Sequence, residues 1–331
     1  MSISKDIARK IVFPFVTGLG LEKLLSAGVK SNKLILVYHG VVEKPDHNVS
    51  VGPIAVEQFA RHLAYFKQNF DVVSQDEIFE MYRNGIVPKR KTIAITFDDG
   101  YENNYRRAFP LLKQYGFPST MYIITQAIED DNRITWYDYI DFVKSDIDVS
   151  KIDTGLINEA ALTTISELKA LIKRINISAR QIVYTEIAKQ VDIEKYKAHF
   201  PREFWKLMNK EQLRELANSG LVELGAHSHN HPNLGEIALS DAKEEIEKSK
   251  RLLEEVIQKP VNSIAFPDGS YTPQVKQLCL AAGYKNLLAV DYRSGDDADD
   301  KNILPRYCLS STTTFESNMI AVHRNFKAYG F

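Results

Sequence analysis

The chain has 331 residues, of which 44% are hydrophobic, and its formal net charge is −1. This length fits one large α/β domain or two small ones, with enough apolar residues to bury a sizeable core. The sequence has neither a basic stripe nor an acidic tail, which argues against a protein that binds nucleic acid through a general positive field. The two cysteines, Cys279 and Cys308, lie in apolar surroundings without a CxxC spacing. We predict that both are buried free thiols.

Residues 1–32 form a segment that we predict to be helical. Its apolar run, residues 11–21, is broken by Pro14 and two glycines, is too short to span a bilayer and is followed by no clear signal-cleavage site. Two interpretations remain open, a helix packed on the main domain or an amphipathic helix at a membrane surface. We expect a cytoplasmic protein without a membrane span, and leave open peripheral attachment to the inner membrane, export and the oligomeric state.

Seven short apolar runs, most of them followed by a polar turn and a helical pattern, predict parallel βα units. The runs lie at residues 33–40, 70–74, 92–100, 119–125, 221–227, 263–269 and 286–290. The clearest helix covers residues 241–258, where apolar positions recur at steps of three and four. Residues 142–212 are mostly helical in pattern and contain few candidate catalytic side chains. We predict an α/β fold in which they form an insertion that shapes one wall of a cleft.

Two adjacent carboxylates, Asp98 and Asp99, end the third apolar run in the sequence TFDDG. Like charges repel and burial raises their pKa values, so such a pair is costly unless a cation or a reaction uses it. An equal alternative for the pair alone is a turn in which Asp-Gly reverses the chain. Functional loops of parallel βα units lie at the carboxyl ends of strands, where this pair is expected.

Three of the eight histidines fall within residues 227–231, in the sequence HSHNH. His227 and His231 are four residues apart, so in a helical turn both rings face the same way and can bind one cation. His229 is the least certain of the three, either a supporting residue or exposed. One Asp and two His leave room for water around a divalent ion, which is typical of a hydrolytic site. Zn²⁺ is the most probable metal for this set, with Co²⁺ or Ni²⁺ as alternatives.

The order TFDDG and then H-S-x-x-H resembles the polysaccharide deacetylase family, the NodB-homology carbohydrate esterases. The likeness extends from about residue 33 and includes LVYHGVV, TFDDGYENNY, ITWYD, HSHNH, FPDGSY and LPRY. The resemblance implies that residues 33–331 form a deformed (β/α) barrel of about seven parallel strands. It also implies one divalent metal, held by one Asp and two His, and hydrolysis of an acetamido group on a sugar.

Carried over by position, the resemblance makes Asp98 the catalytic base and Asp99 a metal ligand, together with His227 and His231. Neighbouring residues of a strand point to opposite sides, so one carboxylate can reach the metal while the other meets the attacking water. The implied reaction has the metal activate water and polarise the acetyl carbonyl, while a general acid protonates the departing amine.

Two features depart from the usual family pattern. The third motif reads Phe266-Pro267-Asp268-Gly269 without the Arg that many members have, and we predict that Arg306 of LPRY orients Asp98 instead, with a surface arginine as the alternative. The general acid is usually a late His, but His323 lies in a predicted amphipathic helix. We therefore predict His39, which ends the first strand as in the permuted, exopolysaccharide-type arrangement.

Aromatic residues beside a carboxylate suit a sugar ring, because they offer apolar faces for stacking next to a hydrogen-bond acceptor. The predicted substrate-binding residues are Trp136, Tyr137, Asp138, Phe266, Pro267 and Tyr271. We expect a hydrolase that removes N-acetyl groups from amino sugars of a polysaccharide, an oligosaccharide or a lipid-linked glycan. A deformylase or other amidase on the same metal site, and a non-catalytic carbohydrate-binding protein, are the alternatives.

Overall fold

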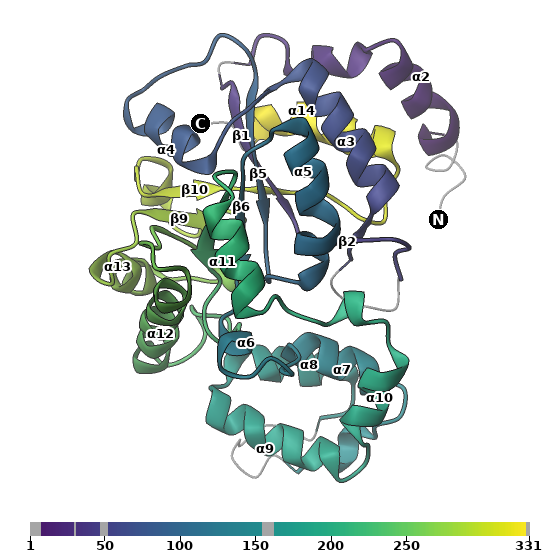
Figure 1. Ribbon diagram of the computed structural model, residues 1–331, viewed down its shortest axis with the longest axis vertical. Coiled ribbons are helices and arrows are strands. Elements are labelled where there is room, and N and C mark those ends of the chain that lie inside the picture. Colours follow the sequence, from purple (N-terminus) through teal and green to yellow (C-terminus); the bar gives the residue numbers. More distant parts are fainter. Residues whose placement is uncertain (1–7, 30, 47–51, 154–161, 329–331) are drawn as a thin grey trace.

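A parallel β-sheet, wrapped by helices, forms the centre of the molecule (Figure 1). The computed structural model describes residues 8–29, 31–46, 52–153 and 162–328. The main sheet has nine strands: β1 Lys33–Tyr38, β4 Asp71–Val72, β5 Thr92–Phe97, β6 Ser119–Ile123, β7 Val222–Ala226, β8 Ser263–Ala265, β9 Asn286–Ala289, β10 Ile303–Pro305 and β11 Tyr307–Cys308. Each of the seven predicted runs contains a strand. The predicted (β/α) barrel is confirmed.

The sheet nearly closes into a barrel through one segment near the end of the chain. Eight strands follow one another in the order β10-β9-β8-β7-β6-β5-β1-β11, and β4 pairs with β5 outside this path. β10 pairs with β9, and β11, only one residue further along the chain, pairs with β1. β10 and β11 are therefore consecutive pieces of one closing segment. Sequence analysis missed both, because Pro305 and Arg306 interrupt a run that is already short.

The helices around the barrel are α3 Val56–Asn69, α4 Gln75–Arg83, α5 Phe109–Tyr115, α11 Lys210–Asn218, α12 Leu239–Ile257, α13 Pro273–Ala281 and α14 Phe315–Ala328. The helix predicted at 241–258 corresponds to α12. Its apolar stripe faces inward as expected, with Ala242, Ile246, Ser249, Leu253 and Val256 all buried.

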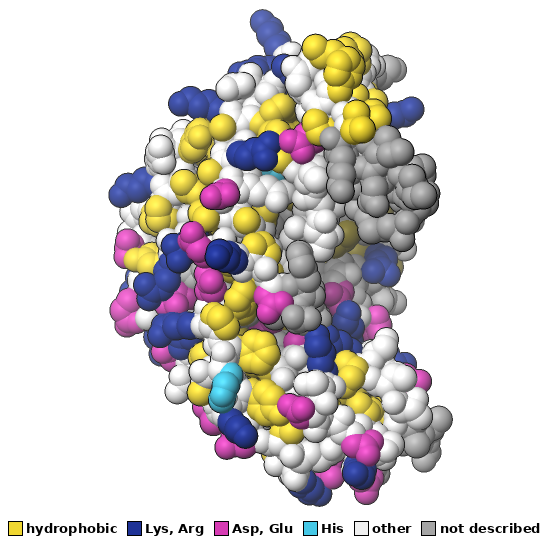
Figure 2. Space-filling model, turned by 90° about the vertical axis from the view of Figure 1, so that its right-hand side faces the viewer, with side chains coloured by type: hydrophobic (Ala, Val, Ile, Leu, Met, Phe, Trp, Pro, Cys, Tyr) yellow, Lys and Arg dark blue, Asp and Glu magenta, His cyan; other side chains and the backbone are white. Residues whose placement is uncertain are grey.

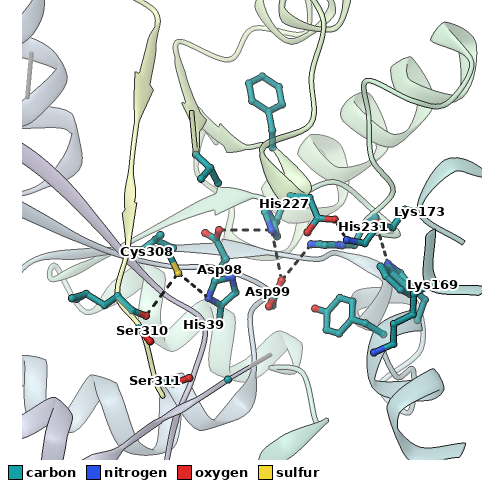
Figure 3. A pocket seen from close by; sticks show the side chains of 18 of the residues that line it. His39, Asp98, Asp99, Lys169, Lys173, His227, His231, Cys308, Ser310 and Ser311 are labelled. Atoms are coloured by element: carbon teal, nitrogen blue, oxygen red, sulfur yellow. Dashed lines mark hydrogen bonds and ion pairs between the residues drawn. The ribbon is translucent and has the colours of Figure 1, made fainter. Parts of the chain in front are cut away.

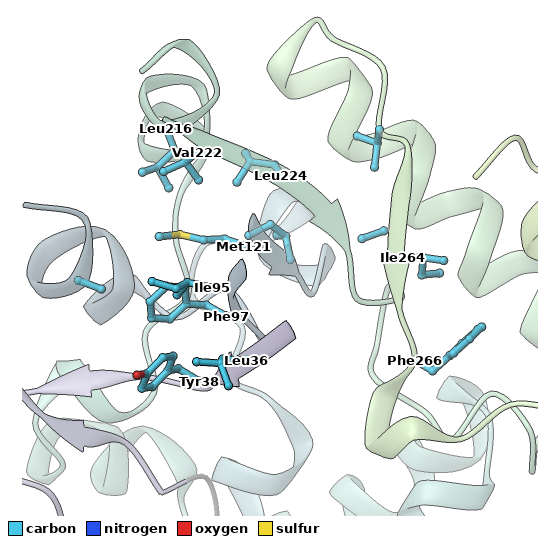
Figure 4. Packing of buried hydrophobic residues seen from close by; sticks show 14 of the residues in the cluster. Leu36, Tyr38, Ile95, Phe97, Met121, Leu216, Val222, Leu224, Ile264 and Phe266 are labelled. Atoms are coloured by element: carbon cyan, nitrogen blue, oxygen red, sulfur yellow. The ribbon is translucent and has the colours of Figure 1, made fainter. Parts of the chain in front are cut away.

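Side chains alternate along each strand and thereby build two separate apolar layers. One set faces the surrounding helices and includes Leu36, Ile95, Met121, Leu224 and Ile264 (Figure 4). The other set forms a second cluster with α4, and it includes Ile35, Ala94, Tyr122, Ala265, Leu288 and Leu304. Because the strands are packed on both sides, the polar residues at their carboxyl ends are held by a rigid frame.

The helices between β6 and β7 include α6 Gln126–Glu129, α7 Trp136–Val143, α8 Ile165–Arg174, α9 Ile177–Ala188 and α10 Ile193–His199. Helices α7 to α10 lie together below the barrel in Figure 1 and have a hydrophobic cluster of their own. α8 begins with a capping box in which Thr164 and Glu167 satisfy each other's backbone N–H groups. This lobe therefore brings its own core to the edge of the barrel.

Short elements complete the described chain: η1 Ala8–Val12, α2 Phe13–Gly18, η2 Leu21–Ser26, β2 Val41–Val42, β3 Ile54–Ala55, η3 Asn104–Ala108, η4 Val149–Lys151, η5 Arg202–Phe204, η6 Pro267–Gly269 and η7 Gly295–Ala298. The N-terminal elements α2 and η2 pack against α14. No helix in the described ranges has both the length and the apolar character needed to cross a bilayer.

Candidate active site

A cavity of about 790 Å³ opens at the carboxyl ends of the barrel strands, next to α8 (Figure 3). It brings together residues that are widely separated in the sequence. Of the residues predicted for the site, its wall contains His39, Asp98, Asp99, Trp136, Tyr137, His227, His231 and Phe266. The barrel architecture explains this convergence, because every parallel strand ends at the same face.

Asp98 is held by a buried arginine. Nη1 and Nη2 of Arg306 donate to the two carboxylate oxygens of Asp98, each at 2.7 Å. Arg306 is 1% exposed and stands between β10 and β11, in the segment that closes the barrel. Burial favours the neutral acid, but the charge and the hydrogen bonds of Arg306 outweigh it and hold the pKa of Asp98 well below its usual value. Asp98 is therefore a carboxylate that faces the cavity in a fixed orientation.

Asp99 lies opposite the two histidines that the sequence pairs with it. Its Oδ1 is 3.6 Å from Nε2 of His227 and 3.5 Å from Nε2 of His231. One ligand atom from each of the three residues lies within 4.8 Å of the others, and all three side chains are buried. A tetrahedral zinc ion with bonds of about 2.0–2.1 Å keeps its ligand atoms roughly 3.3 Å apart. The two distances from Asp99 to the histidines are therefore close to the spacing that a small divalent ion requires.

The hydrogen bonds around these three residues also fit a cation. Nδ1 of His227 donates to the carbonyl oxygen of Ala265 at 2.8 Å, so its Nε2 is left with a lone pair that faces Asp99. Oδ2 of Asp99 is buried and has no hydrogen-bond partner. An unsatisfied buried carboxylate oxygen is costly in the absence of a positive ligand. The nitrogen and oxygen atoms of these three residues thus suit a divalent metal ion, and such an ion would also compensate the unpaired carboxylate oxygen of Asp99.

The HSHNH loop is clamped from two sides. Glu245 of α12 accepts hydrogen bonds from the backbone N–H groups of His229 and Asn230, at 2.9 and 2.7 Å. Arg180 of α9 donates to the carbonyl oxygens of Asn230 and His231, at 2.6 and 3.4 Å. Both side chains are at most 9% exposed. The helical lobe and the barrel therefore jointly fix the position of His231.

Left-handed backbone conformations gather at this site. Among the described non-glycine residues, positive φ occurs at Asp99 (71°), Ser228 (60°), His231 (54°) and Asp268 (51°), all at or next to the cavity, and at Gln258. Such conformations cost roughly 1–3 kcal/mol each. They turn the side chains at strand ends toward the cavity, and the surrounding hydrogen bonds hold them there.

His39 follows β1 and lies in the cavity wall with Asp98 and Asp99 (Figure 3). Its Nδ1 is 3.9 Å from Sγ of Cys308. Burial lowers the pKa of His39, but its contact with Cys308 and the charges of Asp99 and Asp98 outweigh this effect and raise the pKa. The two neighbouring carboxylates therefore favour the protonated form of His39.

The two cysteines differ from each other. Cys279 is buried, as predicted, but Cys308 is exposed, and that prediction was wrong. Alternation along β11 explains the error, because Tyr307 packs against the core while the next residue, Cys308, lies in the cavity wall.

Two other histidines lie away from the cavity. His323 is buried under the N-terminal segment, where its Nδ1 and Nε2 bond to Ser26 and Tyr65 at 2.8 and 2.9 Å. His229 turns to the other side of its loop, where Nε2 is 3.2 Å from Glu129 and Nδ1 is 3.0 Å from Thr125. Of the two candidates for a general acid that the sequence offers, His39 and His323, only His39 is at the cavity.

The predicted substrate-binding residues divide into two groups. Trp136, Tyr137 and Phe266 line the cavity, whereas Asp138, Pro267 and Tyr271 are not part of its wall. Asp138 is 1% exposed and accepts hydrogen bonds from Tyr101 and Thr135 through Oδ2, both at 2.7 Å. Tyr271 stacks on Phe266 and donates to Asp297 at 2.5 Å. Helical periodicity accounts for Asp138, because Trp136 and Tyr137 of α7 face the cavity while the next residue turns inward.

The buried Asp138 makes protein stability depend on pH. Burial raises its pKa to about 8, compared with about 3.9 in an unfolded chain. The folded protein therefore binds a proton that the unfolded chain releases, and this contribution to stability is lost as pH rises from about 4 to about 8. We expect Asp138→Asn, which has no proton to lose, to show a smaller fall in Tm than the wild type between about pH 5 and about pH 9. Parallel Tm curves in a thermal-shift measurement would contradict this expectation.

Residues of α8 form a wall of the cavity that sequence analysis did not resolve to individual side chains. Ser166, Lys169, Ala170 and Lys173 contribute to it, and Lys173 pairs with Asp268 across the cavity at 2.5 Å. The capping box at Thr164 predicts a helix here, but no sequence signal indicates which of its faces meets the barrel.

The model of the family described as polysaccharide deacetylase matches residues 85–287, which is more than half of the chain. The chain belongs to the polysaccharide deacetylase family. It is 30% identical over 115 residues to a Bacillus subtilis (strain 168) protein that carries the family's name, and the match covers 33% of this chain and 39% of that protein. It is 38% identical over 64 residues to poly-beta-1,6-N-acetyl-D-glucosamine N-deacetylase of Escherichia coli (strain K12). That match covers 19% of this chain and 9% of that protein.

The family member also shares its fold with solved structures. IcaB from Ammonifex degensii aligns with a TM-score of 0.57 at 17% identity, covering 89% of this chain and 97% of that one. At this identity the likeness concerns the fold. The chain spans less than half the length of the curated relatives named above.

Proposed function

We propose that the protein is a metal-dependent hydrolase that removes N-acetyl groups from amino sugars of a polysaccharide, an oligosaccharide or a lipid-linked glycan. One observation carries the proposal. A candidate ligand set, Asp99 with His227 and His231, and an arginine-held carboxylate, Asp98, face the same cavity. Membership of the polysaccharide deacetylase family supports the same reaction.

Asp99, His227 and His231 would hold one divalent ion, with Zn²⁺ favoured and Co²⁺ or Ni²⁺ as alternatives for nitrogen and oxygen ligands. When bound, such an ion polarises the acetyl carbonyl and makes water more acidic. The carbonyl of Ala265 fixes the ring of His227 for this task. The clamp on the HSHNH loop does the same for His231, because its backbone cannot shift without breaking hydrogen bonds to Arg180.

Asp98 is proposed as the general base. Its carboxylate is ionised at neutral pH and both of its oxygens are oriented by Arg306, so it can accept the proton of the attacking water. His39 is proposed as the general acid. It faces the same cavity, where Asp98 and Asp99 favour its protonated form, and it can donate to the amine nitrogen, which otherwise leaves poorly. The two groups thus divide the acid and base work between opposite charges.

The cavity wall suits a sugar ring. Trp136, Tyr137 and Phe266 provide apolar faces, and α8 adds the polar side chains of Ser166, Lys169 and Lys173. A volume of about 790 Å³ lies within the range of pockets that enclose most of a drug-sized molecule. The Escherichia coli relative is named for the removal of acetyl groups from poly-beta-1,6-N-acetyl-D-glucosamine, which supports an N-acetylated glucosamine polymer as the first substrate to try.

Acetate release from a panel of N-acetylated glycans, with and without a chelator, tests the proposal. We expect release that stops on chelation and returns with added Zn²⁺, Co²⁺ or Ni²⁺. Matched N-formyl substrates distinguish a deformylase, which would release formate faster than acetate. A carbohydrate-binding protein would bind the glycans but release no acetate with any divalent metal, and that result would overturn the proposal.

A further inference from the structure

The N-terminal segment exposes an unusual number of apolar side chains. Of the twelve large hydrophobic residues that are exposed in the described chain, seven lie on this segment. We call them the N-terminal apolar surface: Ile11, Val12, Phe15, Leu19, Leu21, Leu24 and Leu25. Phe15 and Leu24 are 64% and 67% exposed. Hydrophobic side chains gather at the upper end of the molecule in Figure 2, the end at which α2 lies in Figure 1.

Two polar side chains of the same segment point into the protein. Glu22 and Ser26 of η2 are 1% and 3% exposed. Glu22 accepts a hydrogen bond from Tyr65 at 2.5 Å, and Ser26 bonds to His323 at 2.8 Å. The usual arrangement of an amphipathic segment, apolar inside and polar outside, is therefore reversed. These hydrogen bonds oppose a rotation that would turn the apolar face inward, because it would separate Glu22 from Tyr65 and Ser26 from Nδ1 of His323.

The charges beside this surface are positive. Lys23 of η2 is exposed, and so are Arg324 and Lys327 of α14, the helix against which η2 packs. The only acidic residues in 8–29 and in α14 are Glu22, which is buried, and Glu316, which pairs with Arg61 at 3.0 Å. Two copies of the chain joined symmetrically through this surface would bring like charges together. The exposed apolar side chains and the positive charges beside them instead complement a surface in which negative charges cover an apolar layer.

We infer that the N-terminal apolar surface docks on a membrane that contains anionic lipids. Phe15, Leu19 and Leu24 enter the boundary between head groups and acyl chains, while Lys23 and Arg324 contact the lipid phosphates. Attachment is peripheral, since no described helix can cross the bilayer. α2 and the helical lobe lie at opposite ends of the long axis in Figure 1, so the cavity next to α8 stays open to a glycan.

Co-sedimentation of the full chain with vesicles tests this inference. We expect binding to vesicles of phosphatidylcholine mixed with phosphatidylglycerol, and much weaker binding to phosphatidylcholine alone. Phe15→Gln/Leu19→Gln should lower the partition coefficient at least about tenfold, because two apolar side chains leave the lipid. Lys23→Gln/Arg324→Gln should weaken binding to the anionic vesicles and reduce its dependence on salt.

Ile177→Gln/Ile182→Gln is the matched control. These isoleucines are also exposed, but they lie on α9 at the far end of the molecule, so this variant should bind vesicles as the wild type does. The Tm of each variant is measured beside that of the wild type, so that weaker vesicle binding is not mistaken for loss of the fold. Equal sedimentation of wild type and Phe15→Gln/Leu19→Gln would overturn the inference. So would a wild-type dimer in ultracentrifugation that this variant converts to monomer, because the surface would then join two copies.

Discussion

Replacing Asp98 with asparagine is expected to lower turnover by about 10²–10⁴-fold while leaving bound metal in place. The amide cannot take a proton from water, but it keeps nearly the same shape. The proposed metal ligands Asp99, His227 and His231 are untouched by the change. Steady-state acetate release, combined with elemental analysis of the purified variant, measures the two effects separately. Turnover near the wild-type value would refute the assignment of Asp98 as the base.

Asp98→Asn is also expected to lower the stability of the protein, and this loss must be distinguished from the loss of turnover. Arg306 is 1% exposed and forms its ion pair with Asp98, so Asp98→Asn leaves a buried charge unpaired at a cost of roughly 3–5 kcal/mol. The double variant Asp98→Asn/Arg306→Met removes both charges and should recover much of the lost Tm without recovering turnover. Asp130→Asn, at an exposed carboxylate, is the matched control and should leave both quantities unchanged.

Replacing His227 with alanine is expected to weaken divalent metal binding by more than about 100-fold and to remove turnover with it. Loss of an outer partner alone typically costs 10–100-fold in affinity, and loss of a ligand should cost more. Competition with a chromogenic chelator measures the affinity without relying on activity. Full metal occupancy in the variant would exclude His227 from the ligand set.

Two other histidines provide controls for this prediction. His229 belongs to the same HSHNH motif but bonds to Glu129 and Thr125 outside the cavity, so His229→Gln should retain metal. His199 of α10 is exposed, and His199→Ala should be neutral. If all three variants lost metal equally, the effect would come from general destabilisation and not from ligation.

The contribution of Arg306 shows where sequence reasoning needs the fold. The motif LPRY offers a candidate cation, but a surface arginine fits the same letters. Arg306 and Asp98 are 208 residues apart in the chain. They meet because β11 pairs with β1, which in turn pairs with β5. A hydrophobic pattern gives the period of a strand but not its neighbour, so it could not predict this contact.

The orientation of the helical lobe was likewise not predictable from local sequence patterns. The pattern at 142–212 predicts helices, because helix periodicity and capping depend on local interactions. Which face of α8 meets the barrel depends on packing between two separate cores, and so Lys169 and Lys173 were not foreseen as parts of the cavity wall. The orientation of Cys308 was missed for a similar reason, since one residue along a strand reverses the side that a side chain faces.

By itself, the sequence determined the strand and helix pattern, the parallel (β/α) class and the residues most suited to chemistry, namely Asp98, Asp99, His227 and His231. These follow from local periodicity and from the rarity of such side chains at the ends of apolar runs. The tertiary structure alone decided that β10 and β11 close the barrel, that Arg306 orients Asp98, that His39 and not His323 reaches the cavity, and that the N-terminal segment turns its apolar side outward. The physical reason is that each of these depends on contacts between distant segments, which form only when the whole core packs.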